Sequence, residues 1–440
     1  MTHAQPSIQI LHAKWLITCE EKNQILEKHA LVIQNDKILA ILPSDEATHR
    51  YPTALHQHYP SHAILPGFIN SHTHIAMNIF RGFADDLELM DWLSNYIWPA
   101  EGKWVSHELV YDASQLAIAE MIRCGTTCFN DMYFFLGATA EAAEEAGIRA
   151  HIGMHIIDVP TAWARTTEEY FSKAIEFYEA YKNHPLITPT LAPHSTYTVS
   201  MENLKRVKEL AQQYHLKINI HLQEVPYEIE RSMAVYNKRP LQCLHDLGMV
   251  TPDLIAIHMT QLDQQDLAIL QEMKPHIVHC PESNMKLASG ACPVEQLNQL
   301  GINVALGTDS AASNNDLDMM GEMRSAALLG KLVAKDPKAV SAETTLKMAT
   351  LHGARALGIE RYTGSLTPGK AADCIPINLN RIETQPLYHP LSHIVYAASC
   401  HQVTDVWVAG KQLLKNRQLL TLDKSKLIKK AKTWRNKIKK

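Results

Sequence analysis

The stretch Ala63-Ile64-Leu65-Pro66-Gly67-Phe68-Ile69-Asn70-Ser71-His72-Thr73-His74 joins an apolar run to two histidines at its end. Alternate side chains of a β-strand share one face, so His72 and His74 point the same way. Two imidazoles on one face at the end of a strand can hold a single metal ion. The chain contains 24 histidines, so the prediction of a metal site depends on further ligands elsewhere.

The composition is that of a globular protein with room for a large and a small domain. The chain has 440 residues, of which 46% are hydrophobic and 20% charged, with a net charge of -4. This balance gives no reason to expect nucleic acid as a partner. We also expect no secretory signal and no membrane span. The eight cysteines are scattered without a Cys-x-x-Cys pair, which favours reduced thiols and a cytoplasmic location.

The middle of the chain alternates short apolar strands with longer helical stretches, the pattern of parallel βα units. Eight such strands close a (β/α)8 barrel, in which the active site lies at the C-terminal ends of the strands. The predicted strands nearly all end in residues that can bind ligands, namely Asn70 to His74, Asn130-Asp131, His155, His194, His221, His258, His279 and Asp309.

Both ends of the chain are rich in short apolar runs separated by turns. We therefore expect residues 63–359 to form the barrel, and residues 1–62 and 360–440 to form a small β-sandwich with a C-terminal helix. The tail from Asp423 to Lys440 is lysine-rich, with an apolar stripe near one face. We expect this helix to pack its stripe on its own domain, the alternative being that it binds an acidic surface.

Three further strand ends supply candidate ligands beside His72 and His74. The segments Ile218 to His221 and Leu254 to His258 end in histidine, and the segment Ile302 to Asp309 ends in aspartate. Three neutral imidazoles and one carboxylate suit Zn²⁺, although Fe²⁺, Mn²⁺, Co²⁺ or Ni²⁺ can occupy such a site.

Four motifs resemble those of the amidohydrolase superfamily, in its branch of deaminases and triazine hydrolases. They are Pro66 to His74, His221-Leu222-Gln223-Glu224, Gly307 to Asn315, and Gly364 to Asp373. The resemblance covers almost the whole chain and is nearest to the 5′-methylthioadenosine/S-adenosylhomocysteine deaminases. It implies that His72, His74, His221 and Asp309 bind one metal ion, most simply Zn²⁺.

The predicted fourth strand supports a site for one metal rather than two. Two-metal relatives carry a modified lysine at its end, but here the strand runs into Pro193-His194-Ser195. In the mechanism that the resemblance implies, His258 holds the attacking water and Asp309 accepts its proton. Glu224 protonates the ring nitrogen of the substrate, the alternative being that it is a solvated loop carboxylate.

The resemblance also implies an adenine nucleoside as substrate. Glu101 matches a glutamate that binds the ribose hydroxyls in the family, and His194 matches a residue near the base and ribose. In the loop after the third strand, Met154 stands where relatives that accept S-adenosylhomocysteine have an arginine, and only Arg165 remains nearby. Met154, Val159 and Trp163 would suit a methylthio group. These residues favour 5′-methylthioadenosine, with S-adenosylhomocysteine or adenosine as slower substrates.

Two alternatives stay open at this point. The first is a triazine, pterin or guanine-type aminohydrolase or chlorohydrolase on the same fold. The second is a noncatalytic assembly protein that keeps the amidohydrolase fold but not the activity. By analogy with relatives, we expect a homo-oligomer, either a dimer or a tetramer.

Overall fold

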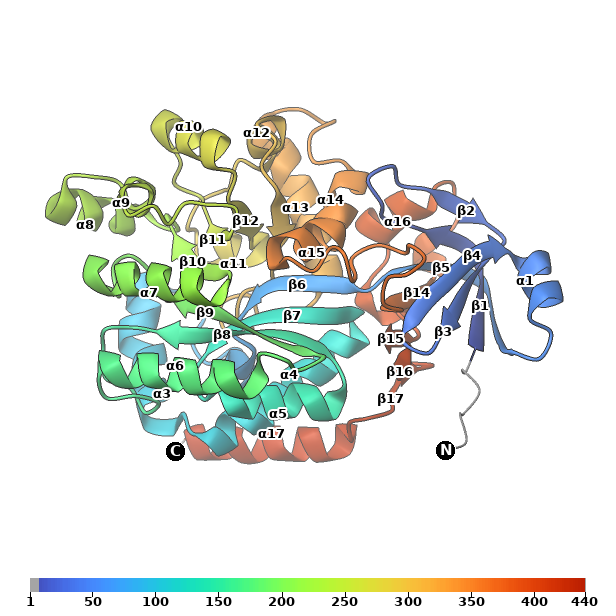
Figure 1. Ribbon diagram of the computed structural model, residues 1–440, viewed down its shortest axis with the longest axis horizontal. Helices are drawn as coiled ribbons and strands as arrows, with labels where there is room; N and C mark the ends of the chain where they lie inside the picture. The colour runs from blue at the N-terminus through green and yellow to red at the C-terminus, as the bar shows by residue number, and fades with distance from the viewer. Residues whose placement is uncertain (1–7, 440) are drawn as a thin grey trace.

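The computed structural model describes residues 8–439, and its larger part is a parallel β-barrel. Eight strands follow one another around the barrel in sequence order (Figure 1). They are β6 (Phe68–Thr73), β7 (Thr126–Tyr133), β8 (Arg149–Ile156), β9 (Ile187–Pro193), β10 (Ile218–Leu222), β11 (Leu254–His258), β12 (His276–His279) and β13 (Val304–Leu306). The predicted (β/α)8 fold is confirmed.

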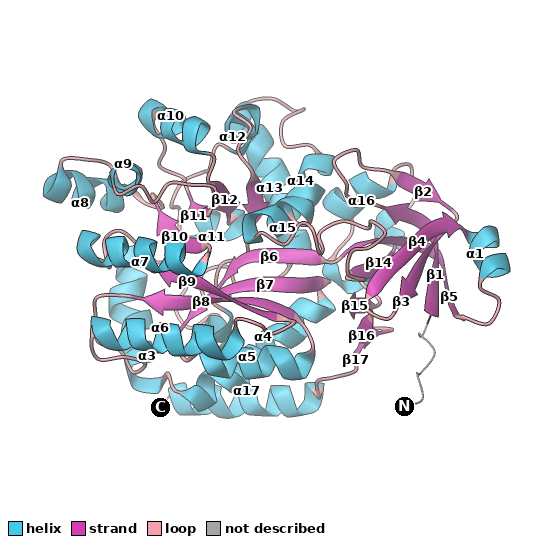
Figure 2. Cartoon of the chain, viewed as in Figure 1, coloured by secondary structure: helices cyan, strands magenta, loops and turns pink. Residues whose placement is uncertain are grey.

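Helices connect the strands and cover the outside of the barrel (Figure 2). They are α4 (His107–Arg123), α5 (Leu136–Ala146), α6 (Thr167–Tyr181), α7 (Met201–Tyr214), α8 (Pro226–Tyr236), α9 (Pro240–Asp246), α10 (Gln264–Met273), α11 (Pro281–Lys286), α12 (Val294–Gln299), α13 (Met319–Ala334), α14 (Ala342–Met348) and α15 (Leu351–Leu357). Side-chain caps begin several of them. Ser106, for example, accepts a hydrogen bond from the backbone N–H of Leu109, which satisfies one of the free donors of the first turn.

Between β6 and α4 the chain forms a cap segment, residues 75–104, over one end of the barrel. It consists of η1 (Ile75–Phe80), α2 (Leu89–Trp92), η2 (Leu93–Ile97) and α3 (Trp98–Trp104). Its buried apolar residues, among them Trp92 and Ile97, pack with Leu109 and Val110 of α4. The cap segment is therefore attached to the barrel by its own small core.

The two ends of the chain build a separate mixed sheet, as predicted for the β-sandwich domain. Its strands are β1 (Ile8–Ile17), β2 (Ile25–Glu27), β3 (His29–Gln34), β4 (Lys37–Pro43), β5 (Leu55–Pro66), β14 (Cys374–Asn378), β15 (Val406–Val408), β16 (Lys411–Lys415) and β17 (Gln418–Leu419). The short elements α1 (Ser44–Arg50), η3 (Ile382–Thr384), α16 (Pro390–Tyr396) and η4 (Cys400–Gln402) lie between these strands in the sequence.

The apolar run from Ala63 to Ile69 is divided between the two sheets. Strand β5 continues through Pro66 in the small sheet, and β6 of the barrel begins at Phe68. A methyl group on Gly67, between them, would lie 2.1 Å from Cγ2 of Thr127, so the chain can make this passage only with glycine. Residues 63–66 therefore lie in the small sheet, although we expected the barrel to begin at residue 63.

The C-terminal helix α17 (Lys424–Ile438) packs on the barrel rather than on the small sheet (Figure 1). Lys430 Nζ and Trp434 Nε1 reach the two carboxylate oxygens of Asp112 in α4, at 2.6 and 2.9 Å. Trp434 is buried in the same cluster as the apolar residues of the cap segment. The expectation that this helix packs on the β-sandwich is corrected, because its apolar stripe covers α4.

Polar side chains fill the interior of the barrel below the strand ends. The Asn70 amide donates to Thr308 Oγ1 at 2.7 Å. The Asn130 amide donates to Asn219 Oδ1, and the Asn219 amide donates to Thr190 Oγ1, both at 2.9 Å. Asn70 and Asn219 precede the predicted ligands His72 and His221 by two residues on the same face of their strands. This amide layer fixes the strands directly beneath the ligands.

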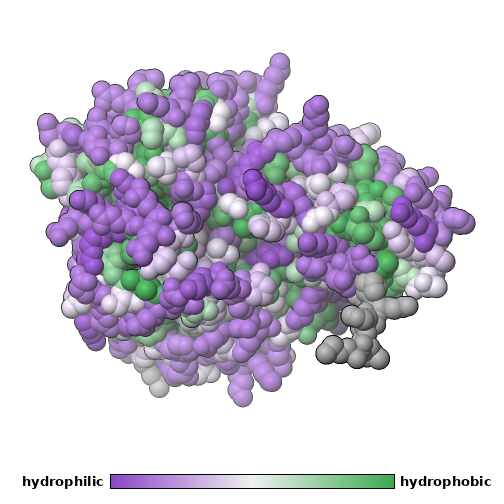
Figure 3. Space-filling model, viewed as in Figure 1, coloured by the Kyte–Doolittle hydropathy of each residue, from purple (hydrophilic) through white to green (hydrophobic). Residues whose placement is uncertain are grey.

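Hydrophilic residues cover most of the face shown in Figure 3, with apolar residues gathered over the small sheet. Among the helices of residues 8–439, none has both the length and the apolar character needed to cross a bilayer.

Candidate metal centre and active site

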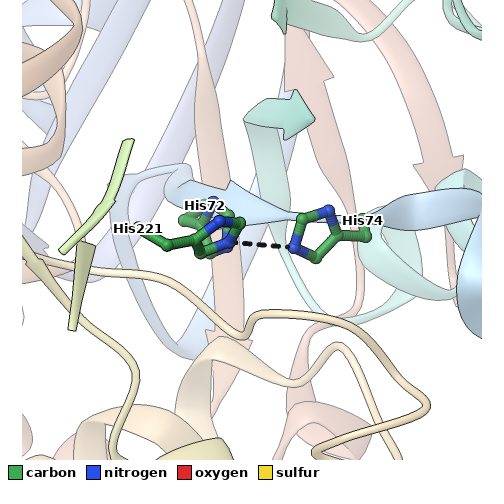
Figure 4. Close-up of side chains that lie close together, drawn as sticks. All are labelled: His72, His74 and His221. Atoms are coloured by element: carbon green, nitrogen blue, oxygen red, sulfur yellow. Dashed lines mark hydrogen bonds between the residues drawn. The ribbon is translucent and has the colours of Figure 1, made fainter. Parts of the chain in front are cut away.

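The three predicted histidine ligands meet at the C-terminal end of the barrel (Figure 4). His221 Nε2 lies 3.2 Å from Nε2 of His72 and 3.2 Å from Nε2 of His74. Asp309 Oδ1 lies 3.4 Å from each of the same nitrogens of His72 and His74. The three imidazoles therefore lie together, with the Asp309 carboxylate next to two of them, and we call these four side chains the ligand cluster.

Backbone carbonyls orient two of the three rings. His74 Nδ1 is hydrogen-bonded to the carbonyl of Met132, and His221 Nδ1 donates to the carbonyl of His194 at 2.8 Å. A proton on Nδ1 leaves Nε2 as a free lone pair that faces the cluster. Burial also lowers the pKa of His72 to about 4, so this ring is neutral at pH 7, as metal ligation requires.

Hydroxyl groups hold the carboxylate of Asp309 in place. Ser283 and Ser313 donate to its Oδ2 at 2.7 and 3.2 Å, and the backbone N–H of Ser310 donates to Oδ1 at 2.8 Å. Burial acts to raise the pKa of Asp309, but hydrogen bonding with His72 holds it well below its usual range. Asp309 is therefore an ionised acceptor at neutral pH.

His258 and Glu224 lie beside the ligand cluster, with 3.7 Å between His258 Nε2 and Glu224 Oε2. The Asn284 amide lies 3.1 Å from His258 Nδ1, and Ser289 Oγ donates to Glu224 Oε1 at 3.2 Å. Burial raises the pKa of Glu224 above its usual value. Glu224 is thus a buried carboxyl that holds a proton more readily than a solvated one, which argues against the alternative of a solvated loop carboxylate.

A cavity of about 370 Å³ opens from this end of the barrel under the cap segment. His74, His221, Asp309, Glu224 and His258 line its inner end. Its wall is largely apolar and comes from the cap segment and from the loop after β8, with Leu89, Trp92, Ile97, Trp98, Val159 and Pro160. An apolar pocket with a few convergent polar groups is the common form of a small-molecule site.

The two predicted nucleoside contacts also line this cavity. Tyr133 donates a hydrogen bond to Glu101 Oε1 at 2.7 Å, while burial raises the pKa of Glu101 to about 7. His194 Nδ1 is 2.9 Å from Thr198 Oγ1, and burial lowers the pKa of His194 to about 3. Glu101 comes from α3 of the cap segment and His194 from the end of β9, so the cavity joins residues far apart in the sequence.

Of the four residues expected at the 5′ substituent, Val159 lines the cavity, whereas Met154, Trp163 and Arg165 do not. Met154 lies on the outer face of β8, in a small apolar space beneath α6 and α7. Trp163 packs against Phe135 with 5.2 Å between ring centroids, and Arg165 is exposed with its N–H bonded to Glu169. These placements differ from the expectation for Met154, Trp163 and Arg165, because alternate strand residues face opposite sides and the part of the loop that lines the cavity ends at Ala162.

The site contains two buried residues, His155 and Glu228, that were not among the site residues predicted from the sequence. His155 occupies the end of β8 next to Met154, but it faces inward and lines the cavity. Glu228, in the first turn of α8, accepts hydrogen bonds from Thr196 Oγ1 at 2.9 Å and from the backbone N–H of Glu224 at 3.1 Å. His155 was visible as a polar strand end, whereas Glu228 carried no signal that separates it from a surface helix carboxylate.

The kinds of ligand in the cluster and their protonation states suit a divalent metal ion. Three neutral imidazoles, two of them oriented through Nδ1, converge with one ionised carboxylate. This is the composition of a mononuclear catalytic site. A (β/α)8 barrel with such a cluster, an adjacent buried Glu–His pair and a largely apolar pocket is the arrangement of a metal-dependent hydrolase.

Comparison with known proteins supports this assignment to the metal-dependent hydrolases. The model of the Amidohydrolase family matches residues 63–413. A 5-methylthioadenosine/S-adenosylhomocysteine deaminase from Teredinibacter turnerae is 44% identical, with 100% of this chain and 99% of the relative aligned. The enzyme of the same name from Saccharophagus degradans is 45% identical, covering 100% and 98%. The chain belongs to the amidohydrolase family, among the 5-methylthioadenosine/S-adenosylhomocysteine deaminases.

Solved structures give the same picture of the fold. An adenosine deaminase from Xanthomonas campestris, solved with bound zinc, has a TM-score of 0.97 at 46% identity and covers 99% of both chains. An atrazine chlorohydrolase from Arthrobacter aurescens has a TM-score of 0.90 at 20% identity, covering 97% of this chain and 100% of its own. The second comparison speaks for the fold alone.

Proposed function

We propose that this chain hydrolytically deaminates an adenine nucleoside, with 5′-methylthioadenosine as the preferred substrate and S-adenosylhomocysteine or adenosine as slower ones. The observation that carries the proposal is the pairing of Glu224 with His258, 3.7 Å apart, where the cavity meets the ligand cluster. The names of the relatives support the same substrate class.

A single divalent ion, which we take to be Zn²⁺, would be held by His72, His74, His221 and Asp309. When bound, such an ion lowers the pKa of water from 15.7 to about 7 and so supplies a nucleophile at neutral pH. The choice of zinc over other divalent ions rests on the three imidazoles and on the zinc in the Xanthomonas structure.

In the proposed reaction, His258, Asp309 and Glu224 carry out the acid–base steps. His258 Nε2 orients the attacking water, and the Asp309 carboxylate takes its proton. Glu224 delivers a proton from its carboxyl group to N1 of the purine while the water oxygen bonds to C6. The proton taken up by Asp309 then passes to the amino group, the C6–N bond breaks to release ammonia, and the proton of the new C6 hydroxyl returns to Glu224, which leaves an inosine-type product with both carboxyl groups in their starting states. General acid–base assistance of this kind is typically worth about 10² to 10⁴ in rate.

The preference for an apolar 5′ group rests on the cavity wall. Val159, Pro160 and Ala162 lie at its outer part, and none of the described residues that line it is lysine or arginine. The zwitterionic tail of S-adenosylhomocysteine would find no cationic partner there.

The test is ammonia release from a panel of 5′-methylthioadenosine, S-adenosylhomocysteine, adenosine, adenine and guanine, with Zn²⁺-loaded protein. We expect the highest kcat/KM for 5′-methylthioadenosine. Activity confined to adenine or guanine would exclude a nucleoside deaminase, and silence on all five would favour triazine or pterin substrates. The homo-oligomeric state and the cytoplasmic location stay predictions, and light scattering would measure the first.

A further inference from the structure

His155 is a buried polar residue of the cavity wall to which the proposed reaction assigns no task. Only 4% of its surface is exposed, yet its ring lines the cavity. Neither ring nitrogen has a hydrogen-bond partner within residues 8–439; Nδ1 is sealed from solvent, so Nε2 is the nitrogen open to the cavity. Buried polar atoms nearly always have a partner, and those that lack one in the protein are completed by a ligand or by water.

The position of His155 along the cavity indicates which part of a ligand it meets. The His194 ring lies 4.9 Å from the ring of His221 in the ligand cluster, between ring centroids. The His155 ring lies another 5.8 Å from that of His194. The three rings thus form the contact series His221–His194–His155, and with C6 of the purine at the ligand cluster we take His155, the last of the series, to meet the sugar.

The neighbours of His155 connect it to the predicted ribose contact. Phe134 meets the His155 ring edge-on, with 4.9 Å between centroids. The adjacent residue, Tyr133, donates its hydroxyl proton to Glu101. Glu101 and His155 are thus joined through two consecutive residues, Tyr133 and Phe134, and all four residues line the cavity.

We propose that His155 is a specificity-determining residue that hydrogen-bonds a hydroxyl group of the substrate's sugar, beside Glu101. This inference rests on the proposed nucleoside deaminase function and adds a second sugar contact to it. A neutral imidazole has one N–H donor and one acceptor nitrogen, so it can pair with a hydroxyl group in either direction. Its burial means that a nucleoside lacking that hydroxyl leaves the imidazole without a partner, which enzymes use to reject such analogues.

The test combines variants of His155 with substrates that lack one hydroxyl. We would measure kcat and KM for 5′-methylthioadenosine and for its 2′-deoxy and 3′-deoxy counterparts, with the wild type, His155→Leu and His155→Gln. In the wild type, loss of the contacted hydroxyl should lower kcat/KM about tenfold or more. In His155→Leu, removing the same hydroxyl group should lower kcat/KM by less than about threefold, because the variant no longer makes the hydrogen bond. His155→Gln, which keeps a donor and an acceptor, should recover part of the discrimination.

His151→Leu is the matched control. His151 lies on the same inward face of β8, is 3% exposed and also has an Nδ1 without a partner, but it does not line the cavity. We expect this variant to keep the wild-type ratio between the ribonucleoside and its deoxy counterparts. If His155→Leu lowers kcat/KM equally for all three substrates, or leaves all three unchanged, the sugar contact is wrong. If the wild type releases ammonia from none of them, the proposed function fails instead.

Discussion

The carboxylate of Glu224 and the ring of His258 lie 3.7 Å apart at the ends of two neighbouring barrel strands, β10 and β11. Each has a support of its own, because Ser289 donates to Glu224 and the Asn284 amide contacts His258. The pair is therefore held in place before a substrate arrives, as efficient acid–base catalysis requires.

Substitution Glu224→Gln removes the proton that the proposed reaction delivers to the purine. We expect kcat to fall by about 10² to 10⁴ while the metal content stays at that of the wild type, since Glu224 is not a ligand. Steady-state kinetics and metal analysis on the same preparation measure both quantities. Near wild-type turnover with full metal content would show that Glu224 has no role as an acid.

Gly307 allows the strand that carries Asp309 to approach the strand that carries His72. A methyl group at position 307 would lie 2.7 Å from the backbone nitrogen of His72 and 2.9 Å from its Cβ. We expect Gly307→Ala to displace His72 and lower the bound metal well below one equivalent per chain. Gly137→Ala is the control, because no atom lies within 4 Å of that added methyl group. Equal metal binding by both variants would contradict this packing argument.

The strand ends could be predicted because the chemistry of the barrel appears in a short local pattern. An apolar strand followed by histidine or aspartate was enough to find His72, His221, His258 and Asp309. The end of β8 was harder to predict, since a shift of one residue exchanges Met154, which faces the helices, for His155, which faces the cavity. The docking of α17 on the barrel could not be predicted either, because an apolar stripe does not say which surface it covers.

Glu228 makes the stability of the fold depend on pH. Burial raises its pKa to about 8, above the usual value of 4.5. Between these two values the unfolded chain releases a proton that the folded chain keeps, so the free energy of unfolding falls as the pH rises. Glu228→Gln imitates the protonated group and removes this contribution. From pH 5.5 to pH 7.5 we expect the wild type to lose about 2 kcal/mol more stability than the variant.

Chemical denaturation at the two pH values measures this difference, and the comparison between variants cancels the other titrating groups. Identical pH dependence of wild type and Glu228→Gln would mean that the Glu228 carboxyl is ionised in the folded protein. The Glu228→Gln variant also tests whether Glu228 holds Glu224 in position, because the backbone N–H of Glu224 donates a hydrogen bond to the Glu228 carboxyl group. We expect a lower kcat with little change in KM.

Trp434 anchors the C-terminal helix on α4. It is 5% exposed, and its indole N–H donates to Asp112 at 2.9 Å. Trp434→Ala should lower the free energy of unfolding by about 3 to 5 kcal/mol through loss of buried surface. Ile428→Ala, on the same helix at a position that is 41% exposed, should change it by less than about 0.5 kcal/mol. Equal effects of the two substitutions in thermal or denaturant unfolding would argue against the docking of α17.

The most direct test of the central claim is to follow 5′-methylthioadenosine with Zn²⁺-loaded protein, by ammonia release and by the ultraviolet change from adenine to hypoxanthine. We predict one equivalent of ammonia per nucleoside converted, with a higher kcat/KM than for S-adenosylhomocysteine or adenosine. Fully metal-loaded protein that leaves all three nucleosides unchanged would contradict the assignment of this cavity to adenine nucleoside deamination.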